Sequence, residues 1–327
     1  MKNVAIIGLG HQHIFTMIEE TLAEKDSLTI KAICDPNSPE NVKKAAEMIP
    51  GVKIYDDMDE LLAKEDIELV LSSSIFGHKS DIAVKSLKAG KHILIDKPLA
   101  TTEEGLNEIE AELKKNPSLK ATLWLTERYA PNYYTAKQLI DAGEIGEVVN
   151  MYFVRPHRLA PTTRPAWFFD KVLYGGILND IGVHDLDMAR WFTNSECKEI
   201  MASHVGTKRY TDYTLEDEGS SMFMMESGAT GVIFENWLTP DKFPAHGDTR
   251  ATVYGTKGQI EVKSWPESVT IFSDTKEPQE VPLVKPSVTS VQDFVLTIDD
   301  PNHKPLVSAN DAIRATRFAL DAQKKAK

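Results

Sequence analysis

The order of apolar and polar positions divides the chain into two regions with different secondary-structure patterns. In the first region, short apolar runs alternate with segments that carry apolar residues at helical spacing. The runs predict strands at residues 2–8, 29–35, 67–74, 91–96 and 119–126. The segments between them predict a helix that follows residue 10 and helices at residues 39–49, 58–64, 78–89 and 102–115. This alternation predicts a doubly wound parallel sheet, in which ligands bind at the carboxyl ends of the strands.

The second region consists mostly of strand patterns that are joined by short turns. After a helix at residues 131–142, the pattern predicts strands at 148–154, 199–205, 220–225, 230–235, 250–254, 259–263 and 268–272, and a last helix at 309–324. Consecutive strands with short turns are typical of antiparallel sheets. The sequence therefore predicts an α/β protein with a parallel-sheet domain at residues 1–126 and an α+β domain at residues 127–327, whose open sheet is mostly antiparallel.

Composition excludes several classes of protein. Hydrophobic residues make up 42% of the 327 residues, which suffices for packed cores, and the length favours two domains. The two cysteines, Cys34 and Cys197, lie in unrelated contexts, which argues against a disulfide framework or a zinc site. A net charge of −12 argues against nonspecific binding to nucleic acid or to anionic membranes. We see neither a membrane-span pattern nor a signal peptide and expect a cytoplasmic protein.

A glycine-rich turn separates the first strand from the first helix. Gly8 and Gly10 supply two positions of the dinucleotide fingerprint of a Rossmann domain, and His13 takes the third. Asp35 ends the second strand, where a carboxylate would bind the adenosine ribose and repel a 2′-phosphate, which favours NAD over NADP. In an extended loop His11 and His13 would point to opposite sides without a further ligand, so we expect no metal there but a role near the cofactor phosphates or in packing.

Two further strands end in polar residues. Ser72, Ser73 and Ser74 follow one of them, and Asp96 and Lys97 follow another. Because the carboxyl ends of parallel strands form one edge, these residues are candidates for ligand binding. Lys97 precedes a proline that forces a turn, which could aim the amine into the crevice or leave it as a solvated loop lysine.

Residues 174–187 read YGGILNDIGVHDLD and carry the strongest candidate for chemistry. On one helix Asp180, His184 and Asp187 would share a stripe, beside an apolar stripe that Asp185 interrupts without an evident reason. A carboxylate one turn from an imidazole can fix its tautomer and support a general base. The alternative is a surface helix with solvated charges.

The segment RPHRLAPTTRPAWFFD at residues 155–170 predicts a long functional loop. Arg155 and Arg164 could pair with carboxylate or phosphate oxygens, His157 adds a polar ring, and Trp167 could stack on a ring face. The alternative is that the arginines form surface ion pairs. A second polar loop at residues 243–250 could reach the same cleft.

Taken together, these segments resemble the glucose-fructose oxidoreductase/inositol dehydrogenase family (Gfo/Idh/MocA). The resemblance covers nearly the whole chain and is carried by GLGHQH at 8–13, the acid at 35, AGKHILIDKPLA at 89–100, DAGEIGEV at 141–148, GGILNDIGVHDLD at 175–187 and YGTKGQIEV at 254–262. The chain departs from the family pattern at Asp96, where glutamate is usual, and at Ser73-Ser74, where Thr-Pro usually precedes the residue matching His78.

The resemblance implies an NAD-dependent oxidoreductase that transfers a hydride between nicotinamide and a hydroxyl or keto carbon of a sugar, polyol or sugar acid. Residues matching the family's catalytic lysine, aspartate and histidine are Lys97, Asp180 and His184, and which of Lys97 and His184 accepts the proton stays open. The implied cofactor site comprises Gly8, Gly10, His11, Gln12, His13, Asp35, Ser73, Ser74, His78, Asp96 and Lys97. The implied substrate site comprises Arg155, His157, Arg164, Trp167 and His184.

The resemblance also implies that the second domain binds the substrate and pairs with another copy, which gives a homodimer or homotetramer. Two alternatives remain open at this point. The chain could use NAD without net redox turnover, as the glycoside-cleaving members of the family do, or it could be a catalytically idle, dinucleotide-binding regulator.

Overall fold

The structure, a computed structural model, describes all residues from Met1 to Lys327. It divides into two units. The first comprises Met1–Leu125, Val172–Tyr174 and Val288–Ile313, and the second comprises Thr126–Lys171, Gly175–Ser287 and Arg314–Lys327. Residues 288–313, which the sequence assigned to the second domain, therefore lie in the first unit.

A parallel sheet forms the centre of the first unit. Its strands are β1 (Lys2–Ile7), β2 (Leu28–Cys34), β3 (Lys53–Tyr55), β4 (Leu69–Ser72), β5 (His92–Asp96) and β6 (Ala121–Trp124). They pair in the order β3-β2-β1-β4-β5-β6, and each pairing is parallel. Three of the strands were predicted close to these bounds, and β4 and β6 were each predicted too long. The short and mostly exposed β3 carries too few apolar residues to be recognised.

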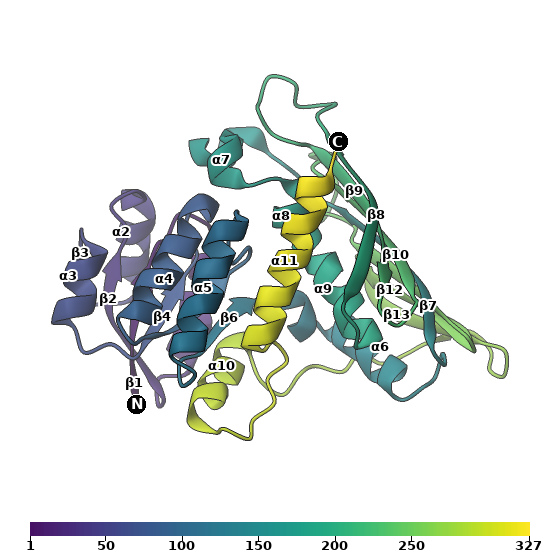
Figure 1. The fold of residues 1–327 in the computed structure, drawn as a ribbon, viewed down its shortest axis with the longest axis horizontal. Coiled ribbons are helices and arrows are strands. Elements are labelled where there is room, and N and C mark those ends of the chain that lie inside the picture. The colour runs from purple at the N-terminus through teal and green to yellow at the C-terminus, as the bar shows by residue number, and fades with distance from the viewer. The chain divides into compact units, whose positions relative to one another are not determined.

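Helices cover both faces of this sheet, as the predicted alternation requires. They are α1 (His13–Ala23), α2 (Pro39–Met48), α3 (Met58–Lys64), α4 (Lys79–Lys88) and α5 (Glu103–Lys115), with the short η1 (Phe76–His78) before α4. Figure 1 shows α4 and α5 side by side over the sheet. The starts of α3 and α5 follow from their caps, since Asp57 accepts the amide of Glu60 and Thr102 accepts the amide of Gly105.

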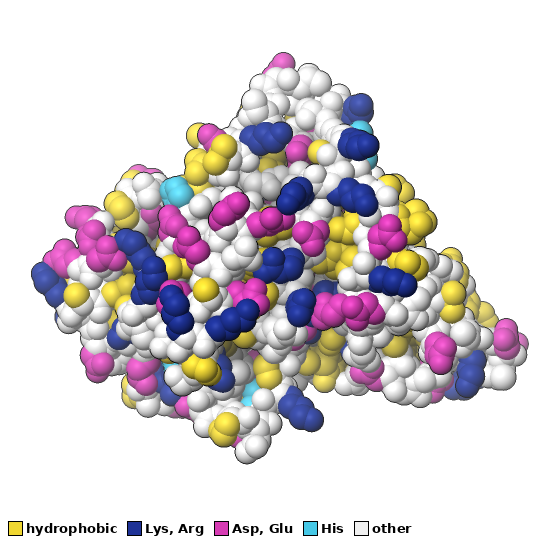
Figure 2. Space-filling model, viewed as in Figure 1, with side chains coloured by type: hydrophobic (Ala, Val, Ile, Leu, Met, Phe, Trp, Pro, Cys, Tyr) yellow, Lys and Arg dark blue, Asp and Glu magenta, His cyan; other side chains and the backbone are white.

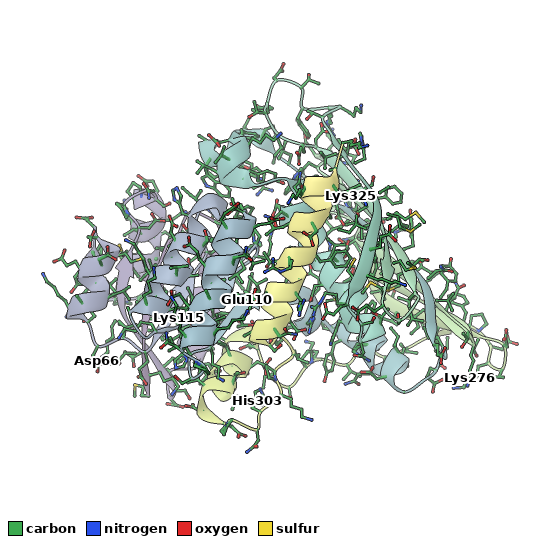
Figure 3. The ribbon with its side chains drawn as sticks, viewed as in Figure 1. Asp66, Glu110, Lys115, Lys276, His303 and Lys325 are labelled. Atoms are coloured by element: carbon green, nitrogen blue, oxygen red, sulfur yellow. The ribbon has the colours of Figure 1, made fainter.

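Helix α10 (Ser290–Asp299) belongs to the first unit and was not predicted from the sequence. A capping box between Thr289 and Gln292 starts it, and its residues Val291 and Phe294 are buried in the core of this unit. His303, labelled in Figure 3, lies 2.6 Å from an oxygen of Asp293 and closes the loop that follows the helix. Apolar packing of α10 against the core that includes α1 therefore brings residues 288–313 into the first unit.

The second unit is built on a sheet of eight strands. They are β7 (Val148–Pro156), β8 (Cys197–Gly206), β9 (Glu218–Met225), β10 (Thr230–Asn236), β11 (Arg250–Gly255), β12 (Gly258–Ser264), β13 (Glu267–Ser273) and β14 (Gln279–Glu280). The order is β14-β13-β12-β11-β7-β10-β9-β8, and every pairing is antiparallel except the parallel pair of β7 and β10. The predicted fold class, a parallel sheet domain plus a mostly antiparallel open sheet, is confirmed.

One face of the eight-stranded sheet is covered by α6 (Pro131–Asp141) and α9 (Gly182–Thr193), and the other carries no helix (Figure 1). Tyr152, Met222 and Phe234 are each more than 40% exposed, and Figure 2 shows hydrophobic side chains gathered over these strands. Two further helices are α7 (Lys171–Tyr174) and α11 (Ala309–Lys325). No helix combines the length and the apolar character that crossing a bilayer requires.

Two predictions about local structure need correction. The single helix expected over the segment 177–192 is divided into α8 (Ile177–Asp180) and α9, because the amide of His184 bonds the Ile181 carbonyl three residues back and tightens the chain at the junction. The long loop expected at 155–170 starts later, since β7 continues to Pro156. It then contains the short turns η3 (Pro161–Thr163) and η4 (Ala166–Phe169).

Candidate functional site

The glycine turn after β1 has the geometry that the dinucleotide fingerprint requires. Gly8 has φ +79°, and a Cβ there would lie 2.5 Å from the Cβ of Ser74. A Cβ on Gly10 would lie 2.8 Å from the backbone nitrogen of Ile75. Both positions therefore demand glycine, because the turn passes directly against the end of β4. No side chain caps the start of α1, and the N-terminal end of a helix is a favourable place for a phosphate group.

A cavity of about 270 Å³ opens beside this turn, within the first unit. It is lined by Gly8, Asp35, Ser74 and His78, all of which the sequence singled out. Asp35 is held in place by backbone amides, since Oδ2 accepts the amide of Leu9 at 2.6 Å and Oδ1 accepts that of Asn37 at 2.9 Å. A rigid carboxylate thus stands at the end of β2, where an adenosine ribose would lie.

The cavity also contains acids that sequence reasoning missed. Asp56 and Asp57 follow β3 and line the same cavity as Asp35. They were overlooked because β3 was not predicted, although the rule that selected Asp35, an acid directly after a strand, applies to them too. A second cavity of about 590 Å³ shares Asp35 and Asp56 and has apolar walls from Val42 and Ile54. Carboxylates beside a space of this kind suit a neutral ribose and disfavour a 2′-phosphate.

Cys34 also lines the first cavity, but it is not a candidate nucleophile. Burial raises the pKa of its thiol to about 12, and burial raises the pKa of Cys197 to about 11. Both thiols therefore stay protonated near neutral pH and act as packing groups.

Asp96 is the centre of a buried polar cluster at the end of β5. Its Oδ2 accepts the Ser73 hydroxyl at 2.9 Å and lies 3.2 Å from the Lys79 ammonium, which also bonds the backbone carbonyls of Asp96 and Lys97. Burial alone would raise the pKa of Asp96, but the charges of Lys79 and His13 hold it well below the usual range. Lys79, itself fully buried, is a structural residue that the sequence did not reveal.

His11 and His13 do not point to opposite sides, as the extended-loop prediction had it. Nδ1 of His11 lies 3.2 Å from Asp96 Oδ2, Nδ1 of His13 lies 3.0 Å from Asp96 Oδ1, and the two ring centres are 4.2 Å apart. The reason is that the backbone at Gln12 is already helical, so the strand alternation that the prediction assumed does not apply.

These three side chains have metal-ligand chemistry, since one ligand atom from each lies within 4.8 Å of the others. However, Asp96 already accepts the charge of Lys79, and an added cation would meet that ammonium at short range. Burial lowers the pKa of His11 to about 3, so its ring is neutral and suited to hydrogen bonding. The cluster is better described as an anchor for the glycine turn and the Lys97 backbone.

Lys97 is not a solvated loop lysine, because only 6% of the residue is exposed. Its carbonyl accepts the Lys79 ammonium at 2.5 Å, and its own Nζ lies 5.3 Å from the centre of the Phe76 ring. Lys79 thus fixes the backbone of Lys97, and Phe76 lies near its ammonium, both within the first unit.

His184 lies in the first turn of α9 and pairs with a residue that sequence reasoning missed. Its Nδ1 lies 2.5 Å from Oε2 of Glu127, which is in η2 (Thr126–Tyr129) after β6. Burial alone would raise the pKa of Glu127, but the charges of His184 and Arg155 hold it well below the usual range. The carboxylate beside Nδ1 favours a proton on that nitrogen, so in the neutral ring Nε2 is the nitrogen that can accept a proton. Sequence analysis could have found Glu127 from its position directly after a predicted strand, the same criterion that selected Asp96.

Arg155 and Asp185 extend the buried group of charged side chains that contains His184 and Glu127. Two nitrogens of Arg155 lie 2.6 and 3.1 Å from Oδ1 of Asp185, and a third lies 2.6 Å from Oε1 of Glu127. Burial would lower the pKa of Arg155, but Asp185 and Glu127 raise it well above its usual value. Asp185 therefore interrupts the apolar stripe to neutralise a buried arginine. Arg155 itself is a strand residue that pairs inside the protein, and not a loop residue.

Asp187 belongs to a second buried pair. Its two oxygens accept from Nε and Nη2 of Arg128 at 2.7 Å each, and Oδ1 lies 3.3 Å from Arg190. Asp185 and Asp187 are both fully buried, so the alternative of a surface helix with solvated charges is wrong. Asp180, the other predicted acid, is 1% exposed in α8.

The remaining predicted substrate residues gather around Trp237. The Arg164 guanidinium stacks 4.7 Å from the Phe168 ring and 5.0 Å from the Trp237 ring, and its Nε donates to the Leu159 carbonyl at 2.9 Å. The His157 ring lies 5.6 Å from that of Trp237.

Two further contacts extend this aromatic group. His157 lies 4.6 Å from the His246 ring, so the loop at 243–250 does meet the loop after β7. Trp167 is buried beside Phe168, with ring centres 5.3 Å apart. The predicted residues thus divide into two groups within this unit, one around His184 and one around Trp237.

Comparison with known proteins agrees with these features. Residues 2–121 match the family described as "Oxidoreductase family, NAD-binding Rossmann fold", and residues 133–261 match the "GFO/IDH/MocA C-terminal domain". A myo-inositol 2-dehydrogenase of Thermotoga maritima is 28% identical over 278 residues, which cover 83% of this chain and 78% of the relative. A scyllo-inositol 2-dehydrogenase (NAD(+)) of Bacillus subtilis is 27% identical over 266 residues, covering 78% and 72%. A solved oxidoreductase structure from Thermotoga maritima has a TM-score of 0.91 at 27% identity and covers 99% of this chain and 97% of its own.

Proposed function

Because the chain belongs to the GFO/IDH/MocA family of NAD-binding oxidoreductases, we propose that it transfers a hydride between NAD and a CH–OH carbon of a polyol or sugar. The observation that carries the proposal is the buried pair of His184 and Glu127, in which a carboxylate oxygen lies 2.5 Å from Nδ1 of the imidazole. Alcohol oxidation requires such a group, since the hydroxyl proton must leave as the hydride departs from carbon.

Bound NAD would supply the hydride acceptor, and the protein would supply binding, orientation and the base. Gly8 and Gly10 let the backbone approach the pyrophosphate, and Asp35 receives the ribose hydroxyls. We assign proton acceptance to His184 and orientation of its ring to Glu127. Lys97 is the alternative acceptor, and its role otherwise is to donate a hydrogen bond to the substrate oxygen.

The contacts of the arginines favour a neutral polyol over a sugar acid. Arg155 is saturated by Asp185 and Glu127, and Arg164 stacks on aromatic rings and donates to a backbone carbonyl. Arg158 donates to the carbonyls of Phe243 and Ala245. Every arginine of the 155–170 segment thus already has partners within the protein, which reduces the charge that it can offer to a substrate carboxylate. The names of the inositol dehydrogenases among the relatives agree with a cyclic polyol.

The test is to incubate the protein with NAD and a panel of inositols, aldoses, aldonic acids and glycosides, and to follow the absorbance of NADH. We expect turnover with polyols or sugars and little with acids. Cleaved glycoside without accumulated NADH would instead support the non-redox alternative. Tight NAD binding with no product from any member of the panel would favour the idle regulator and contradict the proposal.

Replacement of Asp35 by alanine is expected to raise the Kd for NAD by about 10–100-fold, because a hydrogen bond to a charged group is lost. Discrimination against NADP should fall in the same variant, since one of the carboxylates that repel a 2′-phosphate is removed. Titration of both cofactors by fluorescence measures the two effects. Asp35→Asn separates charge from hydrogen bonding, and the exposed Asp66→Ala is the matched control. Tighter binding of NADP than of NAD by the unmodified chain would show that Asp35 has been assigned incorrectly.

We also propose that a second copy of the chain covers the helix-free face of the eight-stranded sheet. Support comes from the exposed Tyr152, Met222 and Phe234, because large apolar side chains that gather on one face usually mark an interface. Light scattering of the purified protein would show a dimer or tetramer if this is correct and a monomer if it is not.

A further inference from the structure

A buried acid lies next to the His184 cluster and has no role in the chemistry described so far. Glu235 is on β10, where it stands in register with Arg155 of the parallel strand β7, and it is 1% exposed. Neither of its carboxyl oxygens has a hydrogen-bond donor, and Oδ2 of Asp185 also lacks one. Buried carboxylate oxygens without donors are costly, and their presence in a packed core calls for an explanation.

The groups that face Glu235 do not balance a negative charge. Asp185 comes from α9, Asp180 from α8 and Arg155 from β7. Tyr133 of α6 adds a phenol, and burial raises its pKa, so it stays neutral. Arg155 is the cation of this group, and it is already shared by Asp185 and Glu127. An ionised Glu235 would be a further carboxylate beside a guanidinium that two others have neutralised.

A single proton removes the excess charge and leaves only the carbonyl oxygen of Glu235 without a donor among these three oxygens. If Glu235 is a carboxylic acid, its hydroxyl can donate to Oδ2 of Asp185, which supplies the missing donor on Asp185 and removes the uncompensated charge. We propose that Glu235 is a positioning residue that keeps its proton at neutral pH and donates it to Asp185, so that Asp185 holds Arg155 and Arg155 holds Glu127 against His184. The step from this chain of contacts to catalysis rests on the proposed function, whereas the protonation of Glu235 does not.

The electrostatics of the site agree with this assignment. Burial and the neighbouring Asp185 charge raise the pKa of Glu235 well above the usual glutamate value. A group whose folded-state pKa is raised stabilises the fold fully below its unfolded pKa, about 4.3 for glutamate. That contribution is lost as the pH rises through the folded pKa. The protein should therefore lose stability toward alkaline pH, and Glu235 should be one cause.

Glu235→Gln tests the proton directly, because the amide can donate to Asp185 and has nothing to titrate. The test has two readouts. One is the free energy of unfolding in urea between about pH 6 and about pH 9, and the other is the infrared band of the protonated carboxyl group. The expected result is a smaller loss of stability with rising pH in Glu235→Gln, together with loss of the carboxylic acid band. Glu226→Gln, at an exposed glutamate just after β9, should change neither readout. An unchanged pH slope, or no carboxylic acid band in the unmodified protein, would overturn the proposal.

Kinetics test the positioning role separately. Glu235→Ala removes the donor, and we expect kcat to fall by up to about 100-fold with an altered pH–rate profile, because the Glu127 carboxylate loses its fixed place. Glu235→Gln should keep most of the activity, and KM should change little in either variant. Equal losses of kcat in Gln and Ala variants that both fold would refute the positioning role. If the unmodified chain oxidises no alcohol, the proposed function fails, and the unfolding and infrared results still decide whether Glu235 holds the proton.

Discussion

Alanine at position 184 is expected to lower kcat by about 10²–10⁴-fold, the usual contribution of a positioned general base. The reason is that His184 is the proposed proton acceptor, with a carboxylate oxygen of Glu127 2.5 Å from its Nδ1. NAD binding should be retained, because His184 belongs to the second unit and the cofactor cavity is lined by residues of the first. Steady-state kinetics and a separate NAD titration measure both quantities.

Three variants sharpen this experiment. Lys97→Ala should also lower kcat, and the variant that removes the acidic limb of the pH–rate profile, where the rate falls as a base is protonated, identifies the proton acceptor. Glu127→Gln should have a smaller effect than His184→Ala, since it alters the orientation of the ring without removing it. His204→Ala replaces an exposed histidine on β8 and serves as the control. Full activity of His184→Ala would mean that the imidazole takes no part in the reaction.

Replacement of Arg155 by leucine is expected to lower the free energy of unfolding by about 3–5 kcal/mol, the cost of breaking a buried ion pair from one side. The loss is large because Asp185 and Glu127 would both keep a buried carboxylate without its cation, next to Glu235. Urea unfolding at neutral pH, read by circular dichroism, gives the value.

Two comparisons identify the cause of that loss. Arg250→Leu removes an arginine with a side chain 54% exposed, which pairs with Asp248, and it should cost at most about 1 kcal/mol. The double variant Arg155→Leu with Asp185→Leu should recover part of the stability, because an apolar pair avoids one buried charge. If Arg155→Leu were as stable as the Arg250 variant, the charge cluster would contribute little to folding.

The cofactor side of the protein shows how much local sequence can reveal. Gly8, Gly10 and Asp35 were selected from a strand, a turn and a following strand, which are contiguous in the chain, and they line or shape one cavity in the structure. The same rule would have found Asp56 and Asp57 had β3 been recognised. That strand escaped because it has three residues and mostly exposed positions, so it lacks an apolar run.

The partner of His184 shows where local reasoning stops. Helical spacing selected Asp180 and Asp187 as companions of His184, and the structure adds Glu127, a residue far away in the sequence. Asp187 instead pairs with Arg128 and Asp185 with Arg155. Spacing along one helix gives the residues that can share a face. It gives no information about which residues from other elements are packed against that face.

By itself, the sequence determined the two sheets, most of the helices and the glycine turn, and it selected His184 as a candidate for the chemistry. Each of these depends on periodicity or turn chemistry over a few residues, where steric and hydrophobic preferences act locally. Only the tertiary structure showed that Glu127 lies beside His184, that Asp185 pairs with Arg155 and that Glu235 is buried near them. Those outcomes depend on burial, since a charge removed from water must find a partner among whatever residues the packing of distant strands and helices brings to it.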